Sequence, residues 1–251
     1  MAAGEVTFRA PRGAQRTVSL RAGDVHSLVL WSKSYAPLLA RPAMRRRLAE
    51  LNPYFHFSIT GLGGSSWEPG VPSWKEAVKE IAVLVNAFGG GRVNWRFDPV
   101  VYWREGSRIR SNLPLVTQIG ERLAALGVCR CTFSFVRWYR KSLRRVAQSE
   151  LPYLDPPRET RLEAAAELAA AARALGISLS GCCTDDVLGV TGIARGRCVD
   201  GELLANLRDD RLAASRARDR SQREHCGCSR SIDIGSYSQR CPDPCIYCYA
   251  N

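Results

Sequence analysis

The stretch 74–97, WKEAVKEIAVLVNAFGGGRVNWRF, joins one predicted helix to one predicted strand. Apolar residues such as Val78 and Ile81 recur close to the 3.6-residue period and predict a helix over 74–88. After a glycine-rich turn, the short apolar run 92–97 is typical of a strand. The stretch therefore predicts a helix that packs on a sheet and leads directly into it.

Similar patterns alternate on both sides of this unit. Further strands are predicted at 27–31, 55–59, 130–135, 177–180 and, with a weaker pattern, 231–234. Further helices are predicted at 37–51, 115–126, 158–175 and 203–224. Alternating strands and helices predict a parallel sheet with right-handed crossovers. We therefore expect an α/β fold, as a partial or closed β/α (TIM-like) barrel, with an open doubly wound sheet as the alternative.

The composition is that of an ordinary globular protein of 251 residues, with 45% hydrophobic and 24% charged residues. No run of 18 apolar residues and no signal-peptide pattern is visible, so we expect a cytoplasmic protein without membrane contact. Lysine occurs only at 33, 75, 79 and 141, so the other 32 of the 36 basic residues are arginine. A net charge of +12 would attract nucleic acid or phosphorylated substrates, or it is spread as a solvated shell.

The ten cysteines are placed unevenly. The first 128 residues contain none, and the last 26 contain five. Because the cytosol keeps thiols reduced, this clustering favours metal or cluster binding over disulfides.

The terminal stretch CPDPCIYC places Cys241, Cys245 and Cys248 at C-x3-C-x2-C spacing. Two prolines restrict this loop, and three thiolates within eight residues can converge on one small inorganic group. An iron–sulfur cube takes cysteine thiolates and would keep one iron open for another ligand. Zinc is the competing metal, with Cys228 as a fourth ligand, although its usual spacing is two C-x2-C pairs.

Several polar residues follow predicted strands, where a β/α barrel gathers its active site. Lys33, Arg96 and Arg137 are candidates to clamp a carboxylate or phosphate, and Asp98 to orient Arg96 or to contact a ribose hydroxyl. We take these four residues as catalytic candidates. A structural ion pair between Arg96 and Asp98 is the alternative.

The terminal loop resembles that of the radical S-adenosylmethionine (SAM) enzymes, whose motif is C-x3-C-x-aromatic-C, with Tyr247 at the aromatic position. The resemblance implies a [4Fe-4S] cluster on the three cysteines, SAM chelated by the open iron, and Tyr247 beside the SAM nucleoside. It also implies an electron donor such as a flavodoxin or ferredoxin. The string 245–251, CIYCYAN, resembles the spore photoproduct lyase group in particular.

From about Asp24 to Asn251 the chain resembles a bacterial family, domain of unknown function 1848, described by a radical SAM-like cysteine cluster at its C-terminus. The resemblance rests on the following segments: 29–33, 60–61, 68–69, 95–99, 134–135, Cys182, 198–200, 226–228 and 233–235 through to the terminal loop. Members usually begin with an RRTDIP-like strand and continue past the Tyr-Ala-Asn. Because this chain does neither, we expect it to be truncated or mis-started.

Four further cysteines match family positions, namely Cys182, Cys198, Cys226 and Cys228. They are expected to bind a second iron–sulfur cluster or a zinc ion, or to be small core residues. Cys129 and Cys131 alternate in a predicted strand and are expected to pack in the core.

These features divide the chain into three expected parts: a poorly defined N-terminal segment at 1–24, a barrel-like domain at 25–224, and a cysteine-rich iron–sulfur segment at 225–251 packed on the barrel. The leading functional hypothesis is a radical SAM-like iron–sulfur enzyme with an unknown small-molecule or nucleic-acid substrate. The alternatives are a non-enzymatic zinc or iron–sulfur protein and a nucleic-acid-binding or repair protein.

Overall fold

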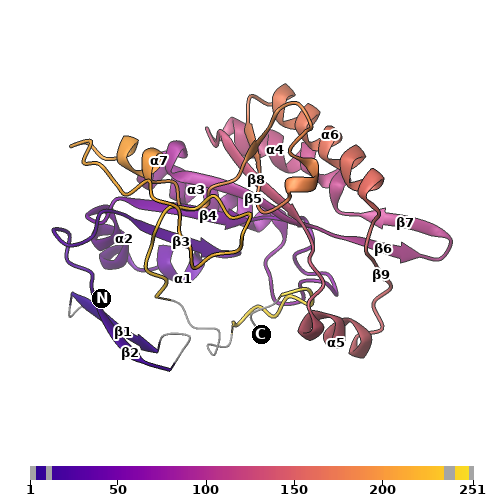
Figure 1. Cartoon of the computed structure of the whole chain (residues 1–251), viewed down its shortest axis with the longest axis horizontal. Helices are drawn as coiled ribbons and strands as arrows, with labels where there is room; N and C mark the ends of the chain where they lie inside the picture. Colours follow the sequence, from indigo (N-terminus) through magenta and orange to yellow (C-terminus); the bar gives the residue numbers. More distant parts are fainter. Residues whose placement is uncertain (1–3, 10–12, 235–240, 249–251) are drawn as a thin grey trace.

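The computed structural model describes residues 4–9, 13–234 and 241–248. Its centre is a six-stranded, fully parallel sheet in the order β11-β10-β8-β5-β4-β3 (Figure 1). The strands are β3 (Leu28–Ser32), β4 (Pro53–Ser58), β5 (Val93–Val100), β8 (Arg130–Phe135), β10 (Ser178–Gly181) and β11 (Ile193–Arg195). The expected α/β class is confirmed.

The sheet does not close into a barrel, so the expectation of a closed barrel is wrong. Strands β3 and β11 form its two edges and do not pair with each other. The strands nevertheless follow one another in chain order, without the reversal that defines a doubly wound sheet. Because right-handed crossovers that all step in one direction place their helices on one side, a single face receives the main helices.

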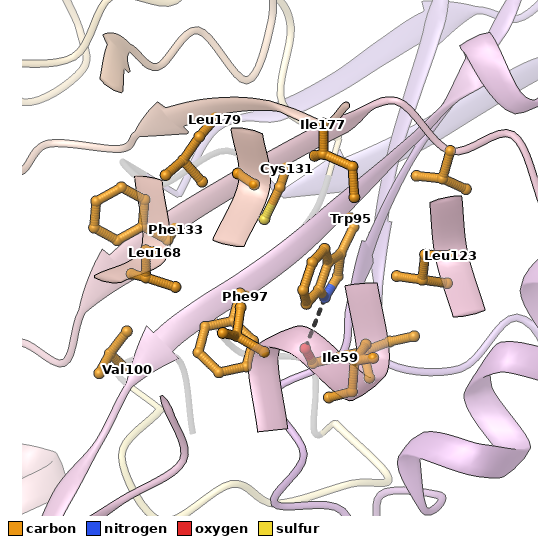
Figure 2. Close-up of a cluster of buried hydrophobic side chains, with 14 of the residues drawn as sticks. Ile59, Trp95, Phe97, Val100, Leu123, Cys131, Phe133, Leu168, Ile177 and Leu179 are labelled. Atoms are coloured by element: carbon orange, nitrogen blue, oxygen red, sulfur yellow. Dashed lines mark hydrogen bonds between the residues drawn. The ribbon is translucent and has the colours of Figure 1, made fainter. Parts of the chain in front are cut away.

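That face carries the apolar core, built around α3 (Trp74–Phe88), α4 (Val116–Ala125) and α6 (Arg158–Ala174). Alternate residues of the central strands point into it, including Trp95 and Phe97 of β5 (Figure 2). The indole of Trp95 is almost fully buried and donates to the Ile59 carbonyl at 2.9 Å. The core is thereby tied to the chain that leaves the carboxyl end of β4.

The opposite face carries a row of polar side chains, one from each of four adjacent strands. We call this set the polar row: His56, Asn94, Thr132 and Ser180. Its members are linked in sequence by hydrogen-bonding contacts of 3.0 Å each. A barrel interior is filled with branched apolar side chains, whereas this face is polar. Irregular chain from the last third of the sequence covers it instead (Figure 1).

The predicted helix at 74–88 is observed with the same bounds, and its N-terminus has a capping box between Ser73 and Glu76. The predictions at 115–126 and 158–175 correspond to α4 and α6. The predicted helix at 37–51 is divided into α1 (Ala36–Leu39) and α2 (Pro42–Ala49). Pro42 explains the division, because proline lacks the N–H that a continuous helix needs and fits at a first turn.

The predicted helix at 203–224 is wrong beyond its first turn, since α7 spans only Gly201–Asn206. The Asp210 carboxylate accepts from Leu212 N, and the Asp219 carboxylate accepts from Ser221 N. Such local side-chain bonds compete with helical backbone bonds. The expected strand at 231–234 is also absent, and those residues have no regular structure.

Several elements were not expected from the sequence. They are the hairpin β1 (Glu5–Arg9) and β2 (Gln15–Ser19), the small sheet of β6 (Tyr102–Glu105), β7 (Arg108–Ser111) and β9 (Tyr153–Leu154), helix α5 (Arg140–Gln148) and strand β11. Three 3-10 turns occupy Gly90–Arg92, Leu113–Leu115 and Asp185–Val187. None of the helices in the described part of the chain is long and apolar enough to cross a membrane. The expected domain boundaries stay a prediction.

Asn112 joins the carboxyl ends of β4 and β5. Its buried amide donates to the carbonyls of Thr60 at 2.9 Å and Pro99 at 3.1 Å, and it accepts from Val101 N at 2.9 Å.

Replacing Asn112 with alanine leaves buried backbone groups unpaired, and we expect the free energy of unfolding to fall by about 3 kcal/mol. Urea unfolding checks this value. Gln118→Ala, on the exposed side of α4, is the control and should change stability by about 0.5 kcal/mol or less; equal losses would contradict the assignment.

Candidate functional site

The terminal loop, residues 241–248, lies at the carboxyl ends of the parallel strands, beside α5 (Figure 1). Its backbone is held on both sides, since Ile246 N donates to Trp67 O at 3.0 Å and Arg145 Nε donates to Ile246 O at 3.1 Å. Cys245 and Tyr247 pack in an apolar cluster with residues that follow β5 and β8. The carboxyl edge of an open parallel sheet is where such folds bind ligands.

A buried carboxylate, Glu68, holds the terminal loop against the sheet. Glu68 is 1% exposed, and its Oε1 accepts from Lys33 Nζ at 3.0 Å and from the hydroxyls of Thr60 and Tyr247. Lys33 follows β3 and Thr60 follows β4, so two strand ends and the terminal loop meet at one oxygen. Sequence reasoning missed this role for Glu68, because a single carboxylate in a Gly- and Ser-rich loop has no distinguishing pattern.

Tyr247 is therefore part of the attachment of the loop. Its side chain is 8% exposed, the Lys33 ammonium lies 5.7 Å from its ring centroid, and burial raises the pKa of its hydroxyl. The expected contact between Tyr247 and a SAM nucleoside stays a prediction. Residues 249–251 of the predicted 245–251 string lie outside the described residues.

Two sulfur atoms of the terminal loop lie near one carbonyl oxygen. Cys241 Sγ and Cys245 Sγ both lie 3.6 Å from the Asp243 carbonyl oxygen, so they are at most twice that distance, 7.2 Å, apart. Cys248 N donates to Cys245 O at 3.1 Å, which keeps the third cysteine in the same turn. Cys241 is exposed, and burial raises the pKa of the Cys245 thiol to about 12. A nearby cation would therefore be needed to hold Cys245 as a thiolate.

The four catalytic candidates do not form one group. Arg96 and Asp98 form the partly buried ion pair that the sequence left open as an alternative, and Asp98 also accepts from Ser134. Lys33 lies at Glu68 instead. Arg137 is exposed, and no hydrogen bond or ion pair between described residues joins it to the other three. A common clamp for a carboxylate or phosphate is not formed here.

Five cysteines meet on the polar face, and we call them the thiol cluster: Cys182, Cys183, Cys198, Cys226 and Cys228. Cys182 Sγ and Cys198 Sγ are 3.8 Å apart. Cys198 and Cys228 are buried in one apolar cluster, Cys182 and Cys226 pack against it, and Cys183 follows Cys182 in the chain. The four cysteines predicted as a second site are thus brought together, and Cys183 joins them.

Cys198 is at the centre of the thiol cluster and is almost fully buried. Hydrogen bonds from Cys182 and Cys228 lower the pKa of Cys198 well below its usual range, and Arg96, with Nη1 3.3 Å from its sulfur, acts in the same direction. The corresponding hydrogen bonds raise the pKa of Cys182 and of Cys228.

Close backbone packing brings these cysteines together. A side chain at Gly196 would collide with the Gly181 carbonyl, and one at Gly227 would be crowded by the Gly196 carbonyl. Glycine at these two positions lets the end of β10, the chain after β11 and the 226–228 segment lie against one another.

The polar row is joined to this packing through His56. Its Nε2 lies 2.7 Å from the Cys198 carbonyl, and Asn94 Nδ2 lies 3.0 Å from its Nδ1. Burial lowers the pKa of His56 to about 4, so the neutral tautomer with the proton on Nε2 fits both contacts.

The remaining cysteines are not part of either group. Cys131 is buried in the helix-covered core, in agreement with its predicted packing role, whereas Cys129 is exposed and its predicted packing role is wrong. Among the described residues, no three His, Cys, Asp or Glu side chains are already arranged to hold a metal ion. Metal binding at the terminal loop or at the thiol cluster therefore stays a prediction.

Two cavities flank these groups. One of about 380 Å³ lies on the polar face near the amino ends of the strands, between the polar row and α7. The other, of about 10 Å³, lies next to Lys33, Thr60 and Glu68 and has room for a single water molecule. The larger cavity is thus at the opposite end of the strands from the terminal loop.

The Tyr247 hydroxyl offers a direct test of how the loop is attached. Tyr247→Phe removes one donor from a buried carboxylate, a hydrogen bond worth about 1.5–3 kcal/mol, so local opening of the loop should increase by about 10- to 150-fold. We expect faster alkylation of Cys245 in metal-free protein, measured by mass spectrometry. Tyr153→Phe, at a half-exposed tyrosine, is the control. An unchanged alkylation rate in Tyr247→Phe would show that the Glu68 contact does not hold the loop.

Comparison with known proteins agrees with the resemblance seen in the sequence. A search among curated proteins gives no match. The sequence model of the family described as "Domain of unknown function (DUF1848)" matches residues 1–250, and so extends through the N-terminal hairpin as well as the terminal loop. Because this match covers nearly the whole chain, the protein belongs to the DUF1848 family.

Proposed function

We propose that this protein is an iron–sulfur protein in which Cys241, Cys245 and Cys248 hold the cluster. The supporting observation is the docking of a three-cysteine loop onto the carboxyl edge of a parallel sheet through the buried Glu68 contacts. This edge is the ligand-binding position of open α/β sheets. The loop is held at three points, by the Trp67 carbonyl, by the Arg145 side chain and by the Glu68 carboxylate.

The donor set fits a thiolate-ligated cluster. Three sulfurs come from one short loop, and two of them are at most 7.2 Å apart around one carbonyl oxygen. Cysteine thiolates are the usual ligands of iron–sulfur clusters. The loop contributes three cysteines rather than four, and a cluster so bound keeps an iron available to an exchangeable ligand such as SAM.

The protein's own residues would position and shield such a group. Cys245 and Tyr247 are buried against the aromatic cluster around Trp67, which excludes water from the inner side. Cys241 is exposed, and the cavity on the inner side is only about 10 Å³. SAM, a substrate and an electron donor such as a flavodoxin or ferredoxin would therefore approach from the side of Cys241. A purely structural iron–sulfur or zinc site is the runner-up.

Anaerobic reconstitution tests the proposal. Full-length protein treated with iron and sulfide should take up about four iron atoms at the terminal loop and develop broad visible absorption. The triple variant Cys241→Ala/Cys245→Ala/Cys248→Ala should lose this uptake. Cys129→Ala, at an exposed cysteine outside both groups, is the matched control and should retain it. Electron paramagnetic resonance of the reduced protein with and without SAM then separates the enzyme from the structural alternative.

The outcomes are distinct. A colourless, iron-free wild-type protein would contradict the proposed cluster. A cluster whose spectrum does not respond to SAM would retain the iron–sulfur protein and remove radical SAM chemistry. Zinc bound at the terminal loop would favour the runner-up.

A second candidate function, nucleic-acid binding, is supported by the surface next to the loop. Helix α5 carries Arg140, Lys141, Arg144 and Arg145 and no acidic residue. Tyr139 and Tyr153 nearby are 37% and 40% exposed. The rings of Tyr153 and Trp138 pack together, with their centroids 4.6 Å apart. Basic side chains interleaved with accessible aromatic rings are typical of surfaces that bind single strands.

Salt dependence tests this candidate. The variant Arg140→Glu/Lys141→Glu/Arg144→Glu should lower the slope of log affinity for a single-stranded oligonucleotide against log salt by about 2, because about 0.7 counterions are released per phosphate contact. Fluorescence anisotropy measures the slope. Arg9→Glu/Arg16→Glu/Arg21→Glu, exposed on and beside the β1–β2 hairpin, changes the net charge equally and is the control. Equal effects of both variants would indicate a general charge effect without a binding surface.

A further inference from the structure

The thiol cluster is assembled from chain segments that are distant in sequence. Cys182 follows β10, Cys198 follows β11, and Cys226 and Cys228 lie in the chain beyond α7. Backbone bonds hold these segments side by side, with Gly196 N donating to Gly181 O at 2.9 Å and Ser229 N donating to Val199 O at 2.7 Å. Chance packing of small apolar residues rarely gathers five cysteines from three segments, so a common ligand is the simpler explanation.

The sulfur spacing indicates what kind of ligand fits. Cys182 Sγ and Cys198 Sγ are 3.8 Å apart, far longer than the roughly 2.05 Å of a disulfide bond. Four sulfurs at about 2.3 Å from one tetrahedral zinc ion are about 3.8 Å from one another. In an iron–sulfur cube each cysteine binds a different iron, which spreads the sulfurs more widely. The observed pair therefore matches one edge of a single-ion tetrahedron.

The chain around the cluster has little other support. Residues 207–234 contain no helix or strand, and the apolar cluster beneath them is small, with Tyr54, Cys198, Val199, Leu204 and Cys228 as its buried members. Irregular segments of this length within a compact domain are uncommon without a function or a staple. Structural zinc supplies folding free energy to such segments directly.

The charge of Arg96 and the orientation of the cysteines also suit a zinc site. Four thiolates around Zn²⁺ leave two net negative charges, and the Arg96 guanidinium already donates to Cys198 Sγ at 3.3 Å. His56 holds the Cys198 backbone through its carbonyl, which limits the directions available to that sulfur. Such outer contacts orient metal ligands. Thr184, two residues after Cys182, is 6% exposed, and its hydroxyl has no hydrogen-bond partner among the described residues.

We propose that Cys182, Cys198, Cys226 and Cys228 bind one zinc ion on the polar face of the sheet, at a site separate from the terminal loop. Binding converts the string of thiol contacts into a closed tetrahedron, and the protons of the ligating thiols are released to solvent. Cys183 lies beside the site without being a ligand. The zinc ion connects the carboxyl ends of β10 and β11 to the irregular chain at 226–228.

The test uses the full chain with the terminal-loop cysteines replaced, Cys241→Ala/Cys245→Ala/Cys248→Ala, so that the two sites are read separately. Protein produced in zinc-supplemented medium should contain about one zinc per chain by elemental analysis. In this background Cys198→Ser and Cys228→Ser should each lose the zinc, whereas Cys183→Ser and Cys129→Ser should retain it. Replacement of zinc by Co²⁺ should give the absorption bands of tetrahedral thiolate coordination.

A second measurement does not depend on the folding of the cysteine variants. In the loop-substituted chain, four thiols should resist alkylation until a chelator is added, and protease cleavage within 207–230 should then become faster. Iron and sulfide in place of zinc, or metal-free protein with a Cys182–Cys198 disulfide, would overturn the proposal. Neither result depends on whether the terminal loop binds a cluster, so failure here is distinct from failure of the iron–sulfur proposal.

Discussion

The structure depends on the different chemistry of the two faces of one parallel sheet. Alternate residues of β4, β5 and β8 direct aromatic side chains toward the helices and polar side chains to the other side. Burial of the aromatic face drives the packing of α3, α4 and α6. The polar face satisfies its own groups through the polar row, and it is covered by chain that brings thiols rather than by a second layer of helices.

The same division explains how far the sequence predicts the fold. Helix α3 and the central strands were predictable, because their apolar periods are strong and local. The closed barrel was wrong because strands such as Val93–Val100 alternate apolar with polar residues, a pattern that does not fill a barrel interior. The stretch 203–224 begins with Leu203, Leu204 and Leu207 at helical spacing, yet the helix ends at Asn206. Side-chain bonds from Asp210 and Asp219 to nearby backbone N–H groups stabilise irregular chain beyond it, and the apolar period does not reveal such bonds.

The sequence also predicts the candidate site only in part. The cysteines themselves were identifiable from their spacing and clustering, and the structure brings the four cysteines at 182, 198, 226 and 228 together. Glu68 was not identifiable, because its role comes from burial beneath a loop 179 residues away in sequence. The catalytic candidates were chosen for their positions at strand ends, but Lys33 and Arg96 point to different partners, Glu68 and Asp98. A position at a strand end does not specify the direction of a long side chain.

The two groups of cysteines differ in ways that suit different roles. Cys241 is exposed and its loop is attached at the carboxyl edge, where small molecules can reach a bound group. Cys198 is almost fully buried, is held by His56 and Arg96, and lies where irregular chain needs support. Catalytic metal sites keep an accessible position, whereas structural sites are closed by protein ligands. The exposure of Cys241 thus supports the proposed reactive cluster at the terminal loop, and the irregular chain around Cys198 supports the proposed structural zinc at the thiol cluster.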